Sequence, residues 1–234
     1  MAENPVAELR ELVVHLKAWL EFQSRLGWAG VPGEKAPPPE QERTTGQAVF
    51  TLTEIREELG DCRRCKLSPS RTQIVFGAGS AQAEIMFVGE GPGEEEDLQG
   101  LPFVGAAGQV LNNLLSKLGL RREEVYIANI VKCRPPRNRD PEEDEIAQCL
   151  PFLTKQIKSI RPRVIVALGK VAAQALLKTA TPITKLRGKW QRYQEIPVMP
   201  TFHPSYLSRF PRERQKTWED MQQVMELLAS HAEI

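Results

Sequence analysis

The sequence contains no long apolar run. Although 41% of its 234 residues are hydrophobic, no stretch approaches the roughly 20 consecutive apolar residues that a membrane-spanning helix needs. The first residues, MAENPVAELRELVVHLKAWLEF, also lack the basic region, unbroken apolar core and small-residue cleavage site of a secretory signal peptide. We therefore expect a cytoplasmic protein that does not enter a membrane.

The chain also has almost no net charge. Its 31 Lys and Arg residues against 30 Asp and Glu residues give a formal charge of +1, which excludes a global basic field that would attract a polyanion. The basic residues gather locally instead, at Arg134, Arg137 and Arg139 and again over residues 209–216. Such clusters are most often solvated surface, so any contact with nucleic acid has to come from local patches.

Cysteine is scarce, with four residues at Cys62, Cys65, Cys133 and Cys149. Disulfides are rare in a reducing cytoplasm, which leaves burial, metal binding or catalysis to explain them. A lone C-x-x-C pair is also typical of redox sites and zinc knuckles, but four cysteines with none to spare favour one four-thiolate site. Zinc and a 4Fe-4S cluster both accept four thiolates, and the spacing alone does not choose between them.

The chain divides into three parts by composition. Residues 1–28 carry apolar side chains at three- and four-residue steps, which predicts an amphipathic helix. Residues 29–49 are rich in Gly, Pro and charge without periodicity, and this pattern is typical of a linker. Residues 50–234 form the predicted main domain, and no internal repeat is evident.

Short apolar runs alternate with helix-period segments through that domain. The predicted strands are residues 85–88, 125–130, 164–168 and 196–199. The predicted helices are residues 52–59, 107–118, 144–160, 171–177 and 212–228. This alternation predicts an α/β fold of three αβα layers around a central four-stranded parallel sheet, with ligands bound outside the carboxyl ends of the strands.

Three unusual features fall at those strand ends: the glycine-rich loop at residues 89–93, then Asn129 and His203. The loop superficially fits a dinucleotide fingerprint, which needs a helix to open at once. Here four acidic residues follow the loop at 94–97, and their carboxylates would repel a pyrophosphate. We also expect no helix before about residue 106. A carboxylate-lined pocket floor and a solvated acidic loop remain as readings.

In this order the segments GEGPGEEED, GLPFVGAAGQ, NIVKCRPPRNRDP and HPSYLSR resemble the family 4 uracil-DNA glycosylases, the iron–sulfur branch of the uracil glycosylase superfamily. The resemblance extends from about residue 53 to residue 228 and includes all four cysteines. It implies a DNA repair enzyme that flips uracil out of DNA, hydrolyses its N-glycosidic bond and leaves an abasic site. It also implies a 4Fe-4S cluster on Cys62, Cys65, Cys133 and Cys149.

The resemblance assigns roles to individual residues. The catalytic residues it implies are Glu90, His203 and Glu96. Those that would bind the substrate base are Gly91, Pro92, Phe103 as stacking aromatic, and Asn129 as reader of the Watson–Crick edge. Those that would contact DNA are Ser205, Leu207 as an apolar wedge, and Arg209.

The implied partner is uracil-containing DNA, single- or double-stranded, acted on by a monomer. A sliding clamp and other repair proteins are candidate further partners that the sequence does not identify. Two other hypotheses are a non-catalytic iron–sulfur nucleic-acid-binding protein of the same fold and a small thiol-redox protein. The first hypothesis gives Asn129 and His203 no shared function. The second requires an exposed, reactive Cys62–Cys65 pair and no bound metal.

Overall fold

The computed structural model describes residues 50–230. The predicted helix over residues 1–28, the linker over residues 29–49, and His15 and His231 lie outside the described residues. The boundaries proposed for the three parts of the chain therefore stay predictions. Within the described part, no helix combines the length and apolar composition that crossing a membrane requires.

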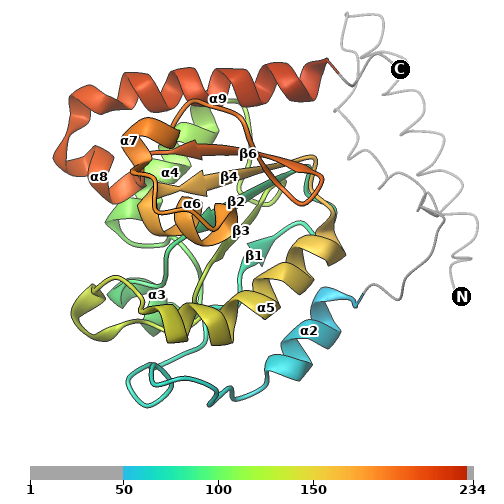
Figure 1. Ribbon diagram of the computed structural model, residues 1–234, viewed down its shortest axis with the longest axis vertical. Coiled ribbons are helices and arrows are strands. Elements are labelled where there is room, and N and C mark those ends of the chain that lie inside the picture. Colours follow the sequence, from blue (N-terminus) through green and yellow to red (C-terminus); the bar gives the residue numbers. More distant parts are fainter. Residues whose placement is uncertain (1–49, 231–234) are drawn as a thin grey trace, which may run out of the picture. The chain divides into compact units, whose positions relative to one another are not determined.

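A six-stranded sheet forms the centre of the domain (Figure 1), with strand order β1-β3-β2-β4-β6-β5. The strands are β1 (Ala78–Gly79), β2 (Ile85–Gly89), β3 (Tyr126–Asn129), β4 (Val164–Leu168), β5 (Gln191–Tyr193) and β6 (Ile196–Thr201). The four inner strands are parallel, as predicted. The prediction of only four strands was wrong, because β1 and β5 add an antiparallel strand at each edge.

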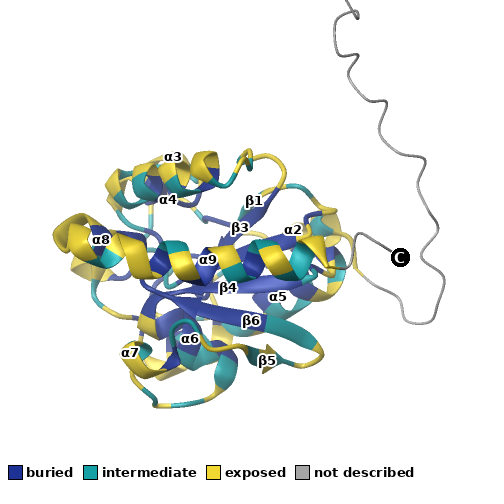
Figure 2. Cartoon of the chain, turned by 90° about the horizontal axis from the view of Figure 1, so that it is seen from above, coloured by how far each residue is buried: buried dark blue, intermediate teal, exposed yellow. Residues whose placement is uncertain are grey.

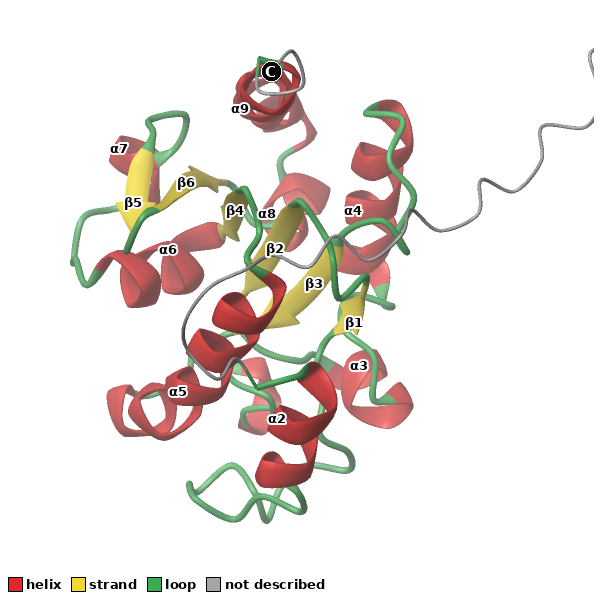
Figure 3. Cartoon of the chain, turned by 90° about the vertical axis from the view of Figure 1, so that its right-hand side faces the viewer, coloured by secondary structure: helices red, strands yellow, loops and turns green. Residues whose placement is uncertain are grey.

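Helices cover both faces of the sheet, which confirms the α/β class (Figure 3). One face carries α4 (Ala106–Lys117) and α9 (Arg214–Ala229), and the other carries α5 (Glu143–Ile160) and α6 (Gly169–Leu177). A further helix, α2 (Leu52–Leu59), packs on α5. Shorter helices are α3 (Glu94–Gln99), α7 (Ile183–Leu186), α8 (Pro204–Arg209) and the 3-10 turns η1 (Pro136–Asn138) and η2 (Pro211–Glu213).

Alternation along the strands divides the core into two layers. In β2, Ile85 and Phe87 pack with α4 and α9, whereas Met86 and Val88 pack with α5 and α6. All four side chains are buried, and Figure 2 shows the same burial along the neighbouring inner strand β4. Successive side chains of a strand point to opposite faces, so a strand that is apolar throughout requires a layer of helices on each side.

Helix α3 begins directly after the glycine-rich loop, so the prediction of no helix before residue 106 was wrong. Gly93 is its N-cap, and its first turn consists of four acidic residues, Glu94 to Asp97. Negative side chains interact favourably with the positive end of the helix dipole, which explains why this polar segment is helical without an apolar stripe.

Candidate active site

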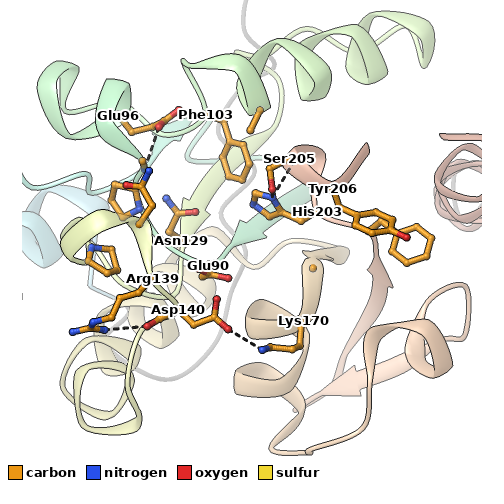
Figure 4. A pocket seen from close by; sticks show the side chains of 18 of the residues that line it. Glu90, Glu96, Phe103, Asn129, Arg139, Asp140, Lys170, His203, Ser205 and Tyr206 are labelled. Atoms are coloured by element: carbon orange, nitrogen blue, oxygen red, sulfur yellow. Dashed lines mark hydrogen bonds and ion pairs between the residues drawn. The ribbon is translucent and has the colours of Figure 1, made fainter. Parts of the chain in front are cut away.

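A pocket of about 570 Å³ lies at the carboxyl ends of the inner strands. The predicted substrate- and DNA-contacting residues all line it except one, Leu207. Around one space, Asn129 and Phe103 lie opposite His203, with Glu90 between them (Figure 4). Residues from four separate stretches of sequence therefore share one cavity.

Strand register brings these residues together. Gly89 at the end of β2 pairs with Asn129 at the end of β3, so Glu90, the next residue, leaves the sheet beside Asn129. On the other side, Leu168 of β4 pairs with Thr201 of β6, and His203 follows two residues later. Gly169 has φ +90°, and a Cβ there would lie 2.8 Å from the Cβ of His203. A glycine is therefore needed where β4 passes the histidine.

Asn129 offers an unused amide to the pocket. The residue is 1% exposed, and within residues 50–230 its Oδ1 is a buried side-chain oxygen without a hydrogen-bond partner. A buried polar atom is ordinarily paired, so an orphaned acceptor facing a cavity indicates that a ligand donates to it. A Cβ on Gly89 would lie 2.4 Å from this Oδ1 and 2.6 Å from Cζ of Phe103, so the glycine keeps the space between them open.

Phe103 is held in a strained backbone conformation. Its φ is +52°, which costs free energy for a residue with a bulky side chain. Arg122 stabilises this turn by donating from Nη1 to the Phe103 carbonyl at 3.0 Å and from Nη2 to the Pro102 carbonyl. A Cβ on Gly108 would lie 1.9 Å from the Phe103 carbonyl oxygen, so α4 contacts the turn through bare backbone. The aromatic ring is thereby fixed 5.6 Å from the ring of His203, centroid to centroid.

The hydrogen bonds of His203 define its tautomer. The backbone N–H of Ser205 donates to Nδ1 at 3.2 Å, and the Ser205 hydroxyl lies 2.8 Å from the same nitrogen. Because a backbone N–H can only donate, Nδ1 is the acceptor and the neutral ring carries its proton on Nε2. Burial lowers the pKa of His203 to about 4, and the charge of Arg209 lowers it further against the opposing effect of Glu96. The imidazole is a neutral Nε2–H donor at physiological pH.

Glu90 is half-buried, and its carboxyl group has no hydrogen-bond partner among the described residues. Burial raises the pKa of Glu90 to about 7, the negative charge of Asp140 raises it further, and the positive charge of Lys170 lowers it. Asp140 and Lys170 form an ion pair of 2.8 Å at the pocket wall. Such a perturbed carboxyl group in a cleft is typical of a catalytic residue.

Two of the four carboxyl groups of the acidic segment tie the loop together. Glu96 accepts from the backbone N–H groups of Val104 (2.8 Å), Gly105 (2.9 Å) and Gly93 (3.1 Å). Asp97 accepts from the N–H of Thr72 at 2.9 Å. These bonds use three of the roughly four acceptor sites of the carboxylate, so the geometry indicates a positioning task for Glu96, and its predicted part in catalysis stays a prediction. The solvated-loop reading applies to Glu94 and Glu95, which are exposed, but not to Glu96 and Asp97, which are buried.

Two of the residues expected to contact DNA are placed differently from the expectation. Leu207 is only 3% exposed and lies on α8, which packs against α4. A wedge has to project from the surface, so Leu207 does not serve as one in this conformation. The Ser205 hydroxyl donates to His203, since Nδ1 carries no proton, and this leaves no hydrogen for a phosphate oxygen. Arg209 is exposed and lines the pocket, as a phosphate contact requires.

The four cysteines meet in a second, small cavity behind the active site. Cys62 and Cys65 follow α2, Cys133 follows β3, and Cys149 lies in α5; none of them forms a disulfide. Within residues 50–230, no three His, Cys, Asp or Glu side chains are grouped as a metal ion would require.

Hydrogen-bond donors surround the sulfur atoms. The Arg64 guanidinium lies 3.2 Å from Sγ of Cys62, and that of Arg71 lies 3.5 Å from Sγ of Cys133. The backbone N–H of Lys132 donates to Sγ of Cys149 at 3.2 Å. Burial raises the pKa of Cys133 and Cys149, and the neighbouring Arg71 and Lys132 oppose this effect. Donors and positive charge favour thiolates, so the chemistry of these residues suits four thiolates, although in the described part of the chain their sulfur atoms are not grouped as in a metal-bound site.

Lys132 is next to Cys133 in the sequence, but the sequence did not reveal its contact with the strand end that carries Asn129. Its side chain is 1% exposed, and its ammonium group donates to the Asn129 carbonyl at 2.9 Å and to Oε1 of Gln156 at 2.7 Å. This buried lysine connects the cysteine cavity to the strand end that carries Asn129. Its position within the apolar stretch NIVKC was the available signal, because a lysine is rarely buried without dedicated partners.

Comparisons with known proteins show which family this chain is similar to. The family model described as the uracil DNA glycosylase superfamily matches residues 76–224. The chain is 49% identical over 185 residues to a type-4 uracil-DNA glycosylase of Saccharolobus solfataricus, covering 75% of this chain and 86% of that protein. It is 50% identical over 159 residues to the type-4 enzyme of Thermotoga maritima, covering 66% and 82%.

A more distant relative is a type-5 uracil-DNA glycosylase of Thermus thermophilus, 33% identical over 142 residues, which cover 54% of this chain and 64% of that protein. The family model spans more than half of the described chain, and the type-4 proteins align over most of their own length. These matches confirm the resemblance on which the site residues were assigned. The chain belongs to the uracil DNA glycosylase superfamily, and within it to the type-4 uracil-DNA glycosylases.

Proposed function

We propose that this protein excises uracil from DNA by hydrolysing the bond between uracil N1 and deoxyribose C1′, leaving an abasic site. The observation that carries the proposal is the orphaned, buried Oδ1 of Asn129 in a pocket that also presents Phe103 and His203. An enzyme that acts on a base inside a duplex has to extrude it into such a pocket and read its edge there.

Asn129 is the proposed base reader. Its Oδ1 would accept from uracil N3–H, and its Nδ2 would donate to uracil O4. Cytosine has an amino group where uracil has O4, and its N3 carries no hydrogen, so it would leave both atoms of the amide mismatched. Unpaired buried polar atoms make such discrimination large. Phe103 would stack on the base. Gly91 and Pro92 also line the pocket, and this stretch of the glycine-rich loop would let the base approach the loop backbone closely.

His203 and Glu90 would act on the two charges that develop during hydrolysis. The neutral Nε2–H of His203 would donate to uracil O2 as the base leaves as an anion. The ionised carboxylate of Glu90 would face the oxocarbenium-like sugar and orient the attacking water. Glu96 would act indirectly, by holding residues 93–105 in the conformation that presents Phe103.

We further propose that Cys62, Cys65, Cys133 and Cys149 hold a 4Fe-4S cluster. The support is their common cavity, the donors around three of the sulfur atoms, and the resemblance of this chain to the iron–sulfur branch of the superfamily. Four thiolates accept zinc equally well, so metal analysis decides between the two. When bound, the group would supply a structural cross-link between segments that are far apart in sequence.

The test is incubation of purified protein with DNA containing a single deoxyuridine, followed by detection of abasic sites. We expect cleavage of uracil DNA and none of the matched thymine DNA, in single strands and in duplexes. A non-catalytic nucleic-acid-binding protein would bind the same DNA and leave it intact, and a thiol-redox protein would neither bind nor cleave it. Wild-type protein that carries its metal and binds the DNA without releasing uracil would overturn the proposal.

A further inference from the structure

Three aromatic rings lead from the pocket to the protein surface along α8. The ring centroids of Phe202 and Tyr206 are 4.9 Å apart, and those of Tyr206 and Phe210 are 4.7 Å apart. Phe202 precedes the N-cap residue of α8 and Phe210 is its C-cap residue, so the three rings follow one another from one end of the helix to the other. Phe202 is buried at 5% exposure, whereas Phe210 is 50% exposed. We refer to Phe202, Tyr206 and Phe210 as the aromatic row.

The aromatic row and the buried residues of α8 occupy different sides of the helix. Pro204 and Leu207 are buried where α8 packs on α4. Phe202 and Tyr206 line the active-site pocket, and Figure 4 shows Tyr206 extending away from His203 toward the outside. Phe210 is the last residue before η2 and lies beyond the pocket lining. The exposed end of the row is therefore next to the pocket entrance.

Two unpaired cations flank Phe210. Arg209 and Arg212 are exposed, and neither has a hydrogen bond or ion pair with any residue of the described chain. By contrast, Lys216 nearby is paired with Glu213 at 2.8 Å. An exposed apolar ring with two free arginines close to it in the chain suits a ligand with both aromatic faces and negative charge, which describes nucleic acid better than an apolar protein surface.

We propose that Tyr206 and Phe210 form a stacking surface for the base adjacent to the extruded uracil, with Arg209 and Arg212 on the neighbouring phosphates. This inference rests on the proposed function and adds a second base subsite to it. Stacking on an aromatic side chain does not depend on the identity of the base, so the subsite would strengthen binding in every sequence context.

Phe50 provides a matched control. It is also a phenylalanine at a similar exposure, 49%, but it precedes α2, which is remote from α8 (Figure 1). The cation over its ring, Lys155, is already paired with Glu58. Substituting either ring removes the same amount of exposed apolar surface, and only Phe210 lies beside the pocket.

The experiment removes the ring from the protein and the base from the DNA in turn. Single-stranded oligonucleotides carry one deoxyuridine with either a normal base or an abasic spacer on its 3′ side, and a second pair has the spacer on its 5′ side. Wild-type kcat/KM should fall about tenfold when the spacer replaces the base on one of the two sides. Phe210→Ala should show a similar loss on the normal substrate and no further loss with the spacer, because the two changes remove one contact.

Phe50→Ala should behave as wild type on all four substrates, and Phe210→Trp should keep the preference for a base over the spacer. The inference is overturned if Phe210→Ala matches Phe50→Ala or still prefers the base to the spacer. It is also overturned if Phe210→Leu, which has no aromatic ring, keeps the full wild-type preference for the base. Failure of the proposed function is a separate outcome, since wild-type protein would then release no uracil from any of these substrates.

Discussion

The backbone N–H of Ser205 donates to Nδ1 of His203 at 3.2 Å, at the N-terminus of α8. His203 thereby caps the helix with one ring nitrogen and presents the other, Nε2–H, to the pocket. The cap and the catalytic donor are one side chain, so the same backbone that starts the helix also sets the tautomer. Pro204, at the first helical position, favours this helix start.

The first prediction compares His203→Ala with Ser205→Ala. Loss of a donor to the leaving base should lower kcat at least about a hundredfold with little change in KM, because that charge exists mainly in the transition state. Ser205→Ala keeps the backbone donor and the tautomer, so its loss should stay under about tenfold. Steady-state kinetics on a uracil duplex measure both. An increase in KM alone for His203→Ala would make His203 a ground-state binder.

The pH dependence should report Glu90. Its pKa of about 7 means that the ionised form increases as the pH rises through neutrality, and that form is the one the mechanism needs. The single-turnover rate should therefore be about tenfold below its plateau at pH 6. His203 adds no limb above pH 5, because it titrates near 4. Glu90→Gln should abolish the ascending limb along with most of the rate.

Variants of the Asp140–Lys170 pair test the direction in which each charge shifts the pKa of Glu90. Removing the negative charge by Asp140→Asn should move the ascending limb to lower pH, and removing the positive charge by Lys170→Met should move it to higher pH. Glu195→Gln, whose side chain is 97% exposed in the turn between β5 and β6, removes a charge at the opposite end of β6 and should move nothing. Identical limbs in all four proteins would mean that another group titrates.

Glu96→Gln should reveal whether Glu96 acts on the substrate or on the loop. An amide keeps one oxygen and replaces the other with a donor, which faces at least one of the backbone N–H groups of Gly93, Val104 or Gly105. An unpaired buried donor costs about 1–3 kcal/mol, so the free energy of unfolding should fall by that amount, and KM should rise. Unchanged stability in denaturant titration, together with a large loss of kcat alone, would assign Glu96 to the chemistry.

Cys149→Ser should remove the metal centre and weaken the fold. We expect wild-type protein to be brown, with broad absorbance near about 400 nm from an iron–sulfur cluster, and the variant to lose this band and much of its soluble yield. The reason is that a thiolate site joining α2, β3 and α5 contributes folding free energy. Iron and sulfide analysis measures the cluster. Colourless wild-type protein with one zinc ion per chain would contradict the iron–sulfur proposal.

The inner sheet could be predicted because its strands are apolar at every position, as in the run from Val164 to Leu168. The edge strands could not: Ala78–Gly79 has two residues, and Gln191–Tyr193 is polar and incompletely buried. Their pairing depends on neighbours that only the folded sheet brings close. Helix α3 was missed because it has no apolar stripe, although four acidic residues after a glycine are a helix-start signal.

The pocket residues could be predicted from the strand ends and the family resemblance, but their hydrogen bonds could not. The sequence does not reveal that the Glu96 carboxylate accepts from three backbone N–H groups while the carboxyl group of Glu90, six residues earlier, accepts from none. Leu207 was misplaced for a similar reason. Its apolar character suits a wedge and a buried helix face equally, and only the packing of α8 on α4 decides between them.

The last prediction concerns Asn129→Asp. The substitution is nearly isosteric and keeps an oxygen where Oδ1 accepts, but it removes the amide hydrogens that would donate to uracil O4. A second oxygen there would face O4, acceptor against acceptor, in a site that is 1% exposed. Uracil excision should therefore fall by about 10²–10⁴, the range expected when buried polar atoms are left unpaired.

Cytosine shows whether the loss is one of recognition. A carboxyl group offers acceptors to the cytosine amino group and, when protonated, a donor to its N3, so Asn129→Asp should gain trace excision of mismatched cytosine that wild type lacks. Asn113→Asp, at an exposed position of α4, makes the same chemical change outside the pocket and should leave base preference unchanged. Both variants are assayed on duplexes with uracil or mismatched cytosine. Wild-type uracil cleavage by Asn129→Asp would exclude Asn129 as the base reader.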